Sequence, residues 1–250
     1  ELRLLIDSVL SNRNVCKTHT KELIKKLTDE GGKYFRNYAK HVTNLDDWQK
    51  DDNRDYFYNI EICCEAIDTE RQIAFYYNYF DIDKLRRKNK PEKSTVSPYR
   101  LFLKNGHYYL ACNYNKHDNL VFIRLDRMSE VEILKCAAKP LKQVENCKDG
   151  INLGKIDSCY PFMYADIPTR IEFVTANYAA HMIDHVIDTF GRNIDITDMG
   201  DGNYKFALTA TPRSMRFWLL QYGKYVKFLS PQSLVDQIKL DIAEMNKLYY

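Results

Sequence analysis

Residues 101–112 read Leu-Phe-Leu-Lys-Asn-Gly-His-Tyr-Tyr-Leu-Ala-Cys, and this stretch decides how the middle of the chain folds. Apolar residues alternate with other residues on both sides of the dipeptide Asn105-Gly106. Asn-Gly is typical of a two-residue β-hairpin, because both central residues of a type I′ turn need positive φ. The stretch therefore predicts two antiparallel strands that turn at Asn105-Gly106.

Alternation with a period of two continues beyond this hairpin in both directions. The apolar positions are Ile73, Phe75, Tyr77 and Tyr79 before it, and Val121, Ile123, Leu125, Val131 and Ile133 after it. Such alternation indicates half-buried strands. A sheet of about five short sequential strands usually closes into a small barrel that hides its edges. We therefore expect residues 67–138 to form a small antiparallel β-barrel.

Residues 1–66 have helical periodicity instead. Apolar residues recur at steps of three and four, at Leu2, Leu5, Ile6, Val9, Leu10, Leu23, Ile24 and Leu27, before Gly31-Gly32 interrupts the pattern. A further helix is predicted from the stripe Ile60, Cys64 and Ile67. The region has too few apolar residues for a core of its own, so we interpret it as a helical connector that packs on another part.

The C-terminal part follows residues 139–159, which we interpret as a linker because Pro140, Gly150 and Gly154 interrupt any periodicity. Residues 160–250 then predict strand, helix, strand, strand, helix, strand and helix in that order. The last helix is expected to start at Ser230-Pro231, with Ser as N-cap and Pro at the first helical position. This order is that of a ferredoxin-like βαββαβ domain with an added helix, so the chain belongs to the α+β class.

Composition limits the class of protein. The formal net charge is only +3, so any contact with nucleic acid requires a local basic patch. The seven cysteines are scattered without a CxxC pair, which fits a reducing cytosol. No apolar run approaches the roughly 18 to 20 residues of a membrane span. We expect a cytoplasmic protein without membrane contact and, because the chain starts at Glu1 rather than Met, further sequence upstream.

Three stretches of the predicted barrel resemble the WYL-domain family of bacterial transcriptional regulators, in the right order and spacing. They are Val96-Ser97-Pro98-Tyr99-Arg100-Leu101, Gly106-His107-Tyr108-Tyr109-Leu110 and Phe122-Ile123-Arg124-Leu125-Asp126-Arg127-Met128. Tyr108 stands where the family has its name-giving Trp, a departure that keeps an aromatic ring. Residues 1–66 look like the connector that follows a helix-turn-helix domain, and residues 160–250 look like the family's C-terminal extension domain.

The resemblance implies an Sm-like or SH3-like barrel that binds a nucleic-acid fragment or a nucleotide-like ligand and controls a DNA-binding domain. It also implies a homodimer. Operator DNA would be contacted only through a helix-turn-helix domain that this chain lacks. The competing hypothesis is a stand-alone accessory protein that binds single-stranded nucleic acid with the same barrel.

The resemblance makes Arg124 and Arg127 candidate ligand contacts. Three residues apart in a strand, they point to opposite faces unless a bulge intervenes. The alternative for each is a structural salt bridge, with Asp126 as one possible partner. Tyr109 alternates with the inward Tyr108 and Leu110, so we expect it on the open side, as a stacking platform for a base or as an ordinary exposed strand tyrosine.

Further candidate contacts are Tyr99 and Arg100, which flank Pro98 and would form a rim, and Lys93 at the end of a basic loop. The basic residues of this loop are Lys84, Arg86, Arg87, Lys88, Lys90 and Lys93, against the single acid Glu92 within it. Such a loop gathers phosphates or is merely a solvated charge run.

No catalytic motif stands out. The chain has neither a glycine-rich phosphate loop nor a Gly-x-Ser-x-Gly elbow. His181 and His185 have the spacing of a metal-binding pair on a helix, but Met182 stands where the metalloprotease pattern has Glu, and no third ligand is evident. We expect no enzyme, no bound metal and no cofactor, with a metal-dependent hydrolase as the remaining alternative.

Overall fold

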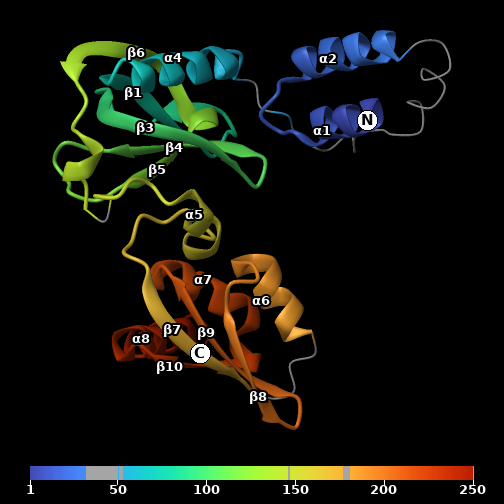
Figure 1. The fold of residues 1–250 in the computed structure, drawn as a ribbon, viewed down its shortest axis with the longest axis vertical. Helices are drawn as coiled ribbons and strands as arrows, with labels where there is room; N and C mark the ends of the chain where they lie inside the picture. The colour runs from blue at the N-terminus through green and yellow to red at the C-terminus, as the bar shows by residue number, and fades with distance from the viewer. Residues whose placement is uncertain (32–49, 51–52, 146, 177–180, 250) are drawn as a thin grey trace. The chain divides into compact units, whose positions relative to one another are not determined.

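The computed structural model describes residues 1–31, 50, 53–145, 147–176 and 181–249. The chain divides into two compact units, Glu1–Asp149 and Gly150–Tyr250. Each unit combines helices with an antiparallel sheet, so the α+β class is confirmed (Figure 1).

In the described part of the first unit, six strands form one antiparallel sheet. They are β1 (Arg71–Phe80), β2 (Arg86–Lys88), β3 (Ser94–Lys104), β4 (His107–Asn113), β5 (Val121–Arg124) and β6 (Met128–Ala137). Strand β2 lies inside the segment that the sequence predicts as a charged loop, where it pairs with Asn78, Tyr79 and Phe80 of β1.

The hairpin at Asn105-Gly106 is confirmed. Asn105 has φ 49° and Gly106 has φ 74°, the positive values that a type I′ turn needs. Lys104 therefore pairs with His107, and the register continues through Phe102 opposite Tyr109. This turn fixes which side chains of β3 and β4 share a face.

The sheet curls into a half-barrel. The strand order is β2-β1-β3-β4-β5, and β6 returns to pair with β1. Strands β5 and β6 are joined by the short 3-10 helix η2 (Leu125–Arg127) and do not pair with each other in the described sheet. The inward face buries an apolar core with fully enclosed residues from four strands and η2, among them Ile73, Phe75, Val96, Leu110, Leu125 and Met128.

The helices of the first unit are α1 (Leu2–Ser11), α2 (Lys17–Glu30) and α4 (Tyr56–Asp68) among the described residues. Helix α4 packs on β1, β3 and β6. The predicted apolar stripe of this helix, Ile60, Cys64 and Ile67, is not its buried face. Cys64 is exposed, and Ile60 and Ile67 are only partly buried. The buried face instead holds Tyr56, Asn59, Ile62, Cys63 and Ala66. Asn59 occupies this face because its amide donates a hydrogen bond of 3.1 Å to the Met128 carbonyl oxygen.

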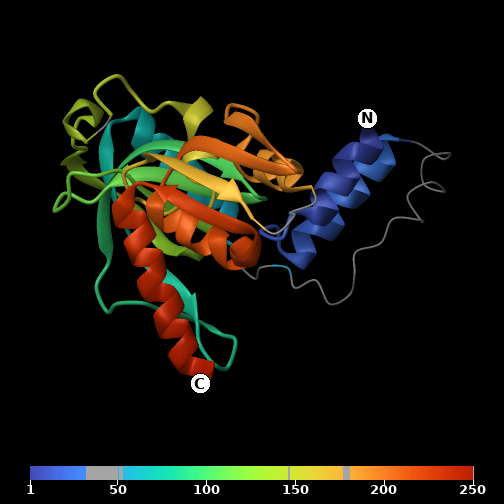
Figure 2. The same cartoon turned by 90° about the horizontal axis from the view of Figure 1, so that it is seen from below.

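The second unit contains a four-stranded antiparallel sheet in the order β10-β7-β9-β8 within its described residues. Its elements are β7 (Thr169–Thr175), α6 (Met182–Phe190), β8 (Asp195–Gly200), β9 (Asn203–Ala210), α7 (Pro212–Tyr222), η4 (Gly223–Tyr225), β10 (Val226–Ser230) and α8 (Gln232–Tyr249). The order of strands and helices matches the predicted order. Figure 2 shows α8 along its length, with the C-terminus at its far end.

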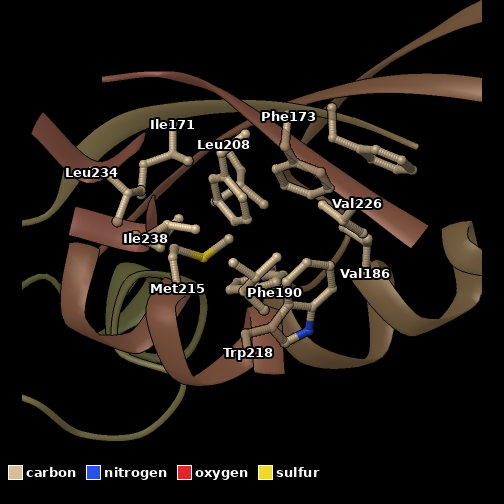
Figure 3. Packing of buried hydrophobic residues seen from close by; sticks show 14 of the residues in the cluster. Ile171, Phe173, Val186, Phe190, Leu208, Met215, Trp218, Val226, Leu234 and Ile238 are labelled. Carbon is tan, nitrogen blue, oxygen red and sulfur yellow. The ribbon is translucent and has the colours of Figure 1, made fainter. Parts of the chain in front are cut away.

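Aromatic rings dominate the core of this second unit (Figure 3). Trp218 of α7 is fully buried, with its ring 5.4 Å from that of Phe173 and 5.5 Å from that of Phe190. Phe173 also stacks on Phe206 at 5.1 Å. Residues from α6, α7 and α8 share this core with β7, β9 and β10, so the three helices cover the same face of the sheet.

Two boundaries differ from the expectation. Helix α5 (Leu153–Cys159) and the 3-10 helix η3 (Leu141–Gln143) lie inside the predicted linker. Helix α8 begins at Gln232, one residue after Pro231, whose carbonyl oxygen accepts hydrogen bonds from the Leu234 and Val235 amides. Among the described residues, no helix is both long and apolar enough to cross a membrane.

Candidate functional site

The outward face of β3, β4 and β5 gathers aromatic and basic side chains. Residues directly opposite each other in antiparallel strands share a face. Phe102 pairs with Tyr109, and Tyr109 pairs with Arg124, whereas Leu101, Leu110 and Ile123 form the matching inward row. We call the outward set the aromatic–basic face; it consists of Arg100, Phe102, His107, Tyr109, Phe122 and Arg124.

Three rings of this face contact one another. The rings of Phe102 and Tyr109 are stacked, with centroids 5.9 Å apart and an interplanar angle of 15°. Phe122 meets Phe102 edge-on at 5.7 Å. All three side chains are half-buried, so part of each ring remains accessible. Burial raises the pKa of the Tyr109 hydroxyl, which therefore stays protonated and uncharged at neutral pH.

Arg124 lies beside these rings and is held by a buried carboxylate. Its Nε and Nη2 atoms lie 3.0 and 2.8 Å from the two carboxylate oxygens of Asp126, which is only 3 % exposed. Burial opposes the charge on Asp126, but the hydrogen bond and charge of Arg124 outweigh it and lower the Asp126 pKa. The same pair, working against burial, raises the pKa of Arg124. The guanidinium is thus both charged and fixed in orientation.

Asp126 also binds a second arginine. The Arg86 Nη2 atom lies 3.5 Å from Asp126 Oδ2, and Arg86 donates a hydrogen bond to the Asp126 carbonyl oxygen. The Asn53 amide donates to the same carbonyl at 3.1 Å. Asp126 therefore joins β2, β5 and the segment before α4 at one buried point.

His107 starts β4 and sits at the edge of the face. Its Nδ1 atom lies 2.8 Å from Asn14 Oδ1 and 3.1 Å from Arg124 Nη2. Burial and then the charge of Arg124 lower the pKa of His107, with further lowering from Arg127 and Arg13 against the opposing effect of Asp126. The ring is therefore neutral at neutral pH.

The expectation that Arg124 and Arg127 lie in one strand is wrong. Strand β5 ends at Arg124, and Arg127 lies in η2. The strand alternation that would separate the two arginines stops at Arg124, and the charge of Arg127 reaches both His107 and Tyr109. Within the described part of the chain, Arg127 has no ion-pair partner. Strand alternation therefore does not place Arg127 on the face opposite Arg124.

Of the other predicted contacts, the structure separates Tyr99 and Lys93 from this group and keeps Arg100 in it. The Tyr99 hydroxyl donates a 2.8 Å hydrogen bond to the Lys139 carbonyl oxygen, and burial raises its pKa to about 12. Lys93 pairs with Glu132 at 3.0 Å and lies 5.6 Å from the Tyr76 ring, on the β1–β6 side. Arg100 is exposed, and its register partner Ala111 pairs in turn with Phe122, so it belongs to the aromatic–basic face.

Most of the predicted basic loop is already paired. Arg87 binds Asp81 at 2.6 Å and Asp83 at 2.5 Å, and Lys88 binds Glu130 at 2.7 Å. Lys84 and Lys90 are exposed. The loop thus offers less free positive charge than its sequence indicates.

Several residues of the site were not predicted. They are Phe102, Phe122, His107 and Asn14, which lie beside Tyr109 and Arg124. Asp126 was expected as a possible salt-bridge partner, and its ion pair with Arg124 is present. Phe102 could have been found, because a two-residue turn at Asn105-Gly106 places it opposite Tyr109. Asn14 could not have been found from the sequence, because it lies 93 residues from His107 along the chain.

A hollow of about 410 Å³ lies in the second unit, beside the first turns of α7 and α8. Arg213, Arg216 and Asp166 line it, and Arg216 is held by Asp241 through contacts of 2.7 and 2.6 Å.

In the described part of the chain, no group of His, Cys, Asp and Glu could hold a metal ion. His181 precedes α6 and lies 3.6 Å from Asp184. His185 lies instead against the ring of Tyr222, at 5.1 Å. The described residues thus bring no metal-ligand set to this pair.

Two protein-family models match the chain. The WYL domain model matches residues 59–133, which include the entire aromatic–basic face, and the WCX domain model matches residues 166–245. The chain belongs to the WYL-domain family. No curated protein matches the sequence.

Solved structures similar to this WYL-domain chain include two at low identity. Proteasome accessory factor B/C (PafBC) of Arthrobacter aurescens has 16 % identity and a TM-score of 0.35, over 96 % of this chain and 34 % of that chain. A CRISPR Cas-related protein has 14 % identity and a TM-score of 0.46, over 99 % of this chain and 72 % of that one. The chain thus spans about a third of the PafBC chain.

Proposed function

We propose that this chain is the ligand-sensing module of a bacterial transcription regulator and binds a nucleic-acid fragment or nucleotide-like ligand on the aromatic–basic face. One observation carries the proposal: a stacked pair of rings, Phe102 and Tyr109, lies one strand away from a fixed guanidinium, Arg124. A base needs a flat ring to stack on, and a phosphate needs a forked donor. Membership of the WYL-domain family supports the regulatory role.

Arg124 keeps donors for a ligand although Asp126 holds it. A guanidinium has five N–H groups, and Asp126 accepts from Nε and Nη2 only, so both N–H groups of Nη1 are left. Asp126 cancels the charge of one arginine, whereas Arg100 and Arg127 have no ion-pair partner among the described residues. The face therefore keeps local positive charge in a chain of net charge +3.

Several finer features belong to the same proposal. The half-barrel is an Sm-like or SH3-like domain over residues 67–138, and the β10-β7-β9-β8 order with helices after β7 and β9 supports a ferredoxin-like domain over residues 160–250. Residues 1–66 act as connector and residues 139–159 as linker. The protein works in the cytoplasm as a homodimer without catalysis, and a domain outside this chain contacts operator DNA.

The test is fluorescence anisotropy with a labelled single-stranded oligonucleotide of about ten nucleotides, a length within the site sizes of small barrels that bind single strands. Arg124→Met should weaken binding about ten- to a hundredfold, the value of a hydrogen bond to a charged group. The matched control Arg71→Met removes an exposed arginine from the start of β1 and should leave affinity unchanged. Equal losses in both variants, or tighter binding of duplex operator DNA than of the single strand, would overturn the proposal.

A further inference from the structure

The Nδ1 atom of His107 has two neighbours that make incompatible demands on it. Asn14 Oδ1, at 2.8 Å, is an acceptor and needs a proton on Nδ1. Arg124 Nη2, at 3.1 Å, carries only N–H groups and needs a lone pair on Nδ1. The Asn14 amide is not free to turn, because its Nδ2 donates to the Gly106 carbonyl oxygen. One ring nitrogen therefore serves only one of the two partners at a time.

Asn14 is the point where the N-terminal helices meet the β3–β4 hairpin. It is 2 % exposed, in the segment 12–16 between α1 and α2, and Val15 and Cys16 beside it are buried too. The end of α1 is held in turn by Lys50, whose Nζ atom donates to the Val9, Leu10 and Asn12 carbonyl oxygens. A change in the hydrogen bond of Asn14 therefore acts on the segment 12–16 that connects α1 and α2.

We propose that His107 is a positioning residue that couples the aromatic–basic face to the segment 12–16. An anionic group bound at Nη1 of Arg124 offsets the charge of the guanidinium and weakens the hydrogen bond from Nη2 to the Nδ1 lone pair, so that Nδ1 carries the proton and donates to Asn14 Oδ1. Ligand and helical segment then stabilise each other, because coupling between two sites is reciprocal. This inference rests on the proposed function for its ligand, while the competition for Nδ1 exists without one.

The competition is tested first without any ligand. Nitrogen-15 NMR of the histidine ring reports which ring nitrogen carries the proton. Arg124→Met should shift the His107 ring toward the form protonated on Nδ1. If this variant does not fold, Arg124→Lys, which keeps a positive charge beside Asp126, replaces it and should give a shift in the same direction. Arg127→Met is the matched control. It removes a positive charge that acts on His107, but Arg127 makes no described hydrogen bond to Nδ1. An equal shift in the control, or no shift at Arg124, overturns the proposal.

The coupling is tested by hydrogen exchange of the amides between Asn14 and Thr20, with and without the single-stranded oligonucleotide. We expect exchange to slow about fivefold or more on binding to the wild-type chain, the lower end of typical coupling energies. In His107→Phe, compared at oligonucleotide concentrations that saturate each chain, the slowing should disappear whatever the change in affinity. Absence of binding to the wild-type chain would refute the proposed function, whereas binding without slowing, or slowing that survives in His107→Phe, would refute the coupling alone.

Discussion

The two sheets of this protein use polar residues in opposite ways. In the second unit the charged pairs on the sheet are surface pairs, such as Lys205 with Glu172 at 2.9 Å, and an aromatic core provides the stability. In the first unit a buried carboxylate, Asp126, holds Arg124 and Arg86 beside half-buried rings. A buried ion pair is weak evidence for stability, but the two contacts from Asp126 hold the Arg124 guanidinium in one orientation. The contrast supports the proposal that the ligand binds on the first sheet.

The largest effect is expected from the core of the second unit. Trp218→Ala removes a fully buried ring that contacts Phe173 and Phe190, and should lower the free energy of unfolding by about 3 to 5 kcal/mol. Urea unfolding followed by circular dichroism measures this loss. Oligonucleotide affinity under native conditions should not change, and a large loss of affinity would break the division of roles between the sheets.

The next effect concerns the buried carboxylate. Asp126→Asn leaves Arg124 and Arg86 without their shared anion and should lower the free energy of unfolding by about 2 to 4 kcal/mol, because both arginines keep some contact with water. The control Glu172→Gln removes a carboxylate from the surface pair and should cost less than about 1 kcal/mol. Equal losses in the two variants would show that Asp126 is an ordinary surface partner.

A smaller effect is expected from the ring that stacks on Tyr109. Phe102→Leu keeps an apolar side chain but removes a stacking surface, and should weaken oligonucleotide binding by about 1 to 3 kcal/mol. Tyr58→Leu on α4 is the control, because this tyrosine is 63 % exposed and lies outside the aromatic–basic face. Isothermal titration calorimetry gives both affinities. If the two variants bind alike, the stacked pair has no part in recognition.

The smallest effect is a dependence of stability on pH through His107. Its pKa in the folded chain lies below the ordinary 6.5, because of burial and then the charge of Arg124. The unfolded chain therefore takes up a proton here at higher pH than the folded chain, and this part of the stability is lost as pH falls below about 6.5. Urea unfolding at about pH 7.5 and about pH 5.5 should show a larger loss for wild type than for His107→Phe. An identical loss would contradict the lowered pKa.

Local patterns in the sequence predict the hairpin at Asn105-Gly106 and the strands of both sheets except β2, whose charged residues indicate a loop. The same turn is enough to pair Phe102 with Tyr109, since register follows from a two-residue loop. Contacts between distant segments escape such patterns. Asn14 contacts His107 although the two are 93 residues apart in the sequence. The buried face of α4 is set by the hydrogen bond of Asn59 to the Met128 carbonyl oxygen rather than by the predicted apolar stripe. The place of Arg127 was missed because a 3-10 turn interrupts the strand period after Arg124.

The central claim is that ligand binds on the outward face of β3, β4 and β5. Amide chemical-shift mapping of the nitrogen-15-labelled chain, titrated with the single-stranded oligonucleotide, tests it most directly. The account predicts that the largest changes fall on Phe102, His107, Tyr109 and Arg124, with the residues of Gly150–Tyr250 unchanged. Largest changes in the loop 84–93 or in the second unit would contradict it.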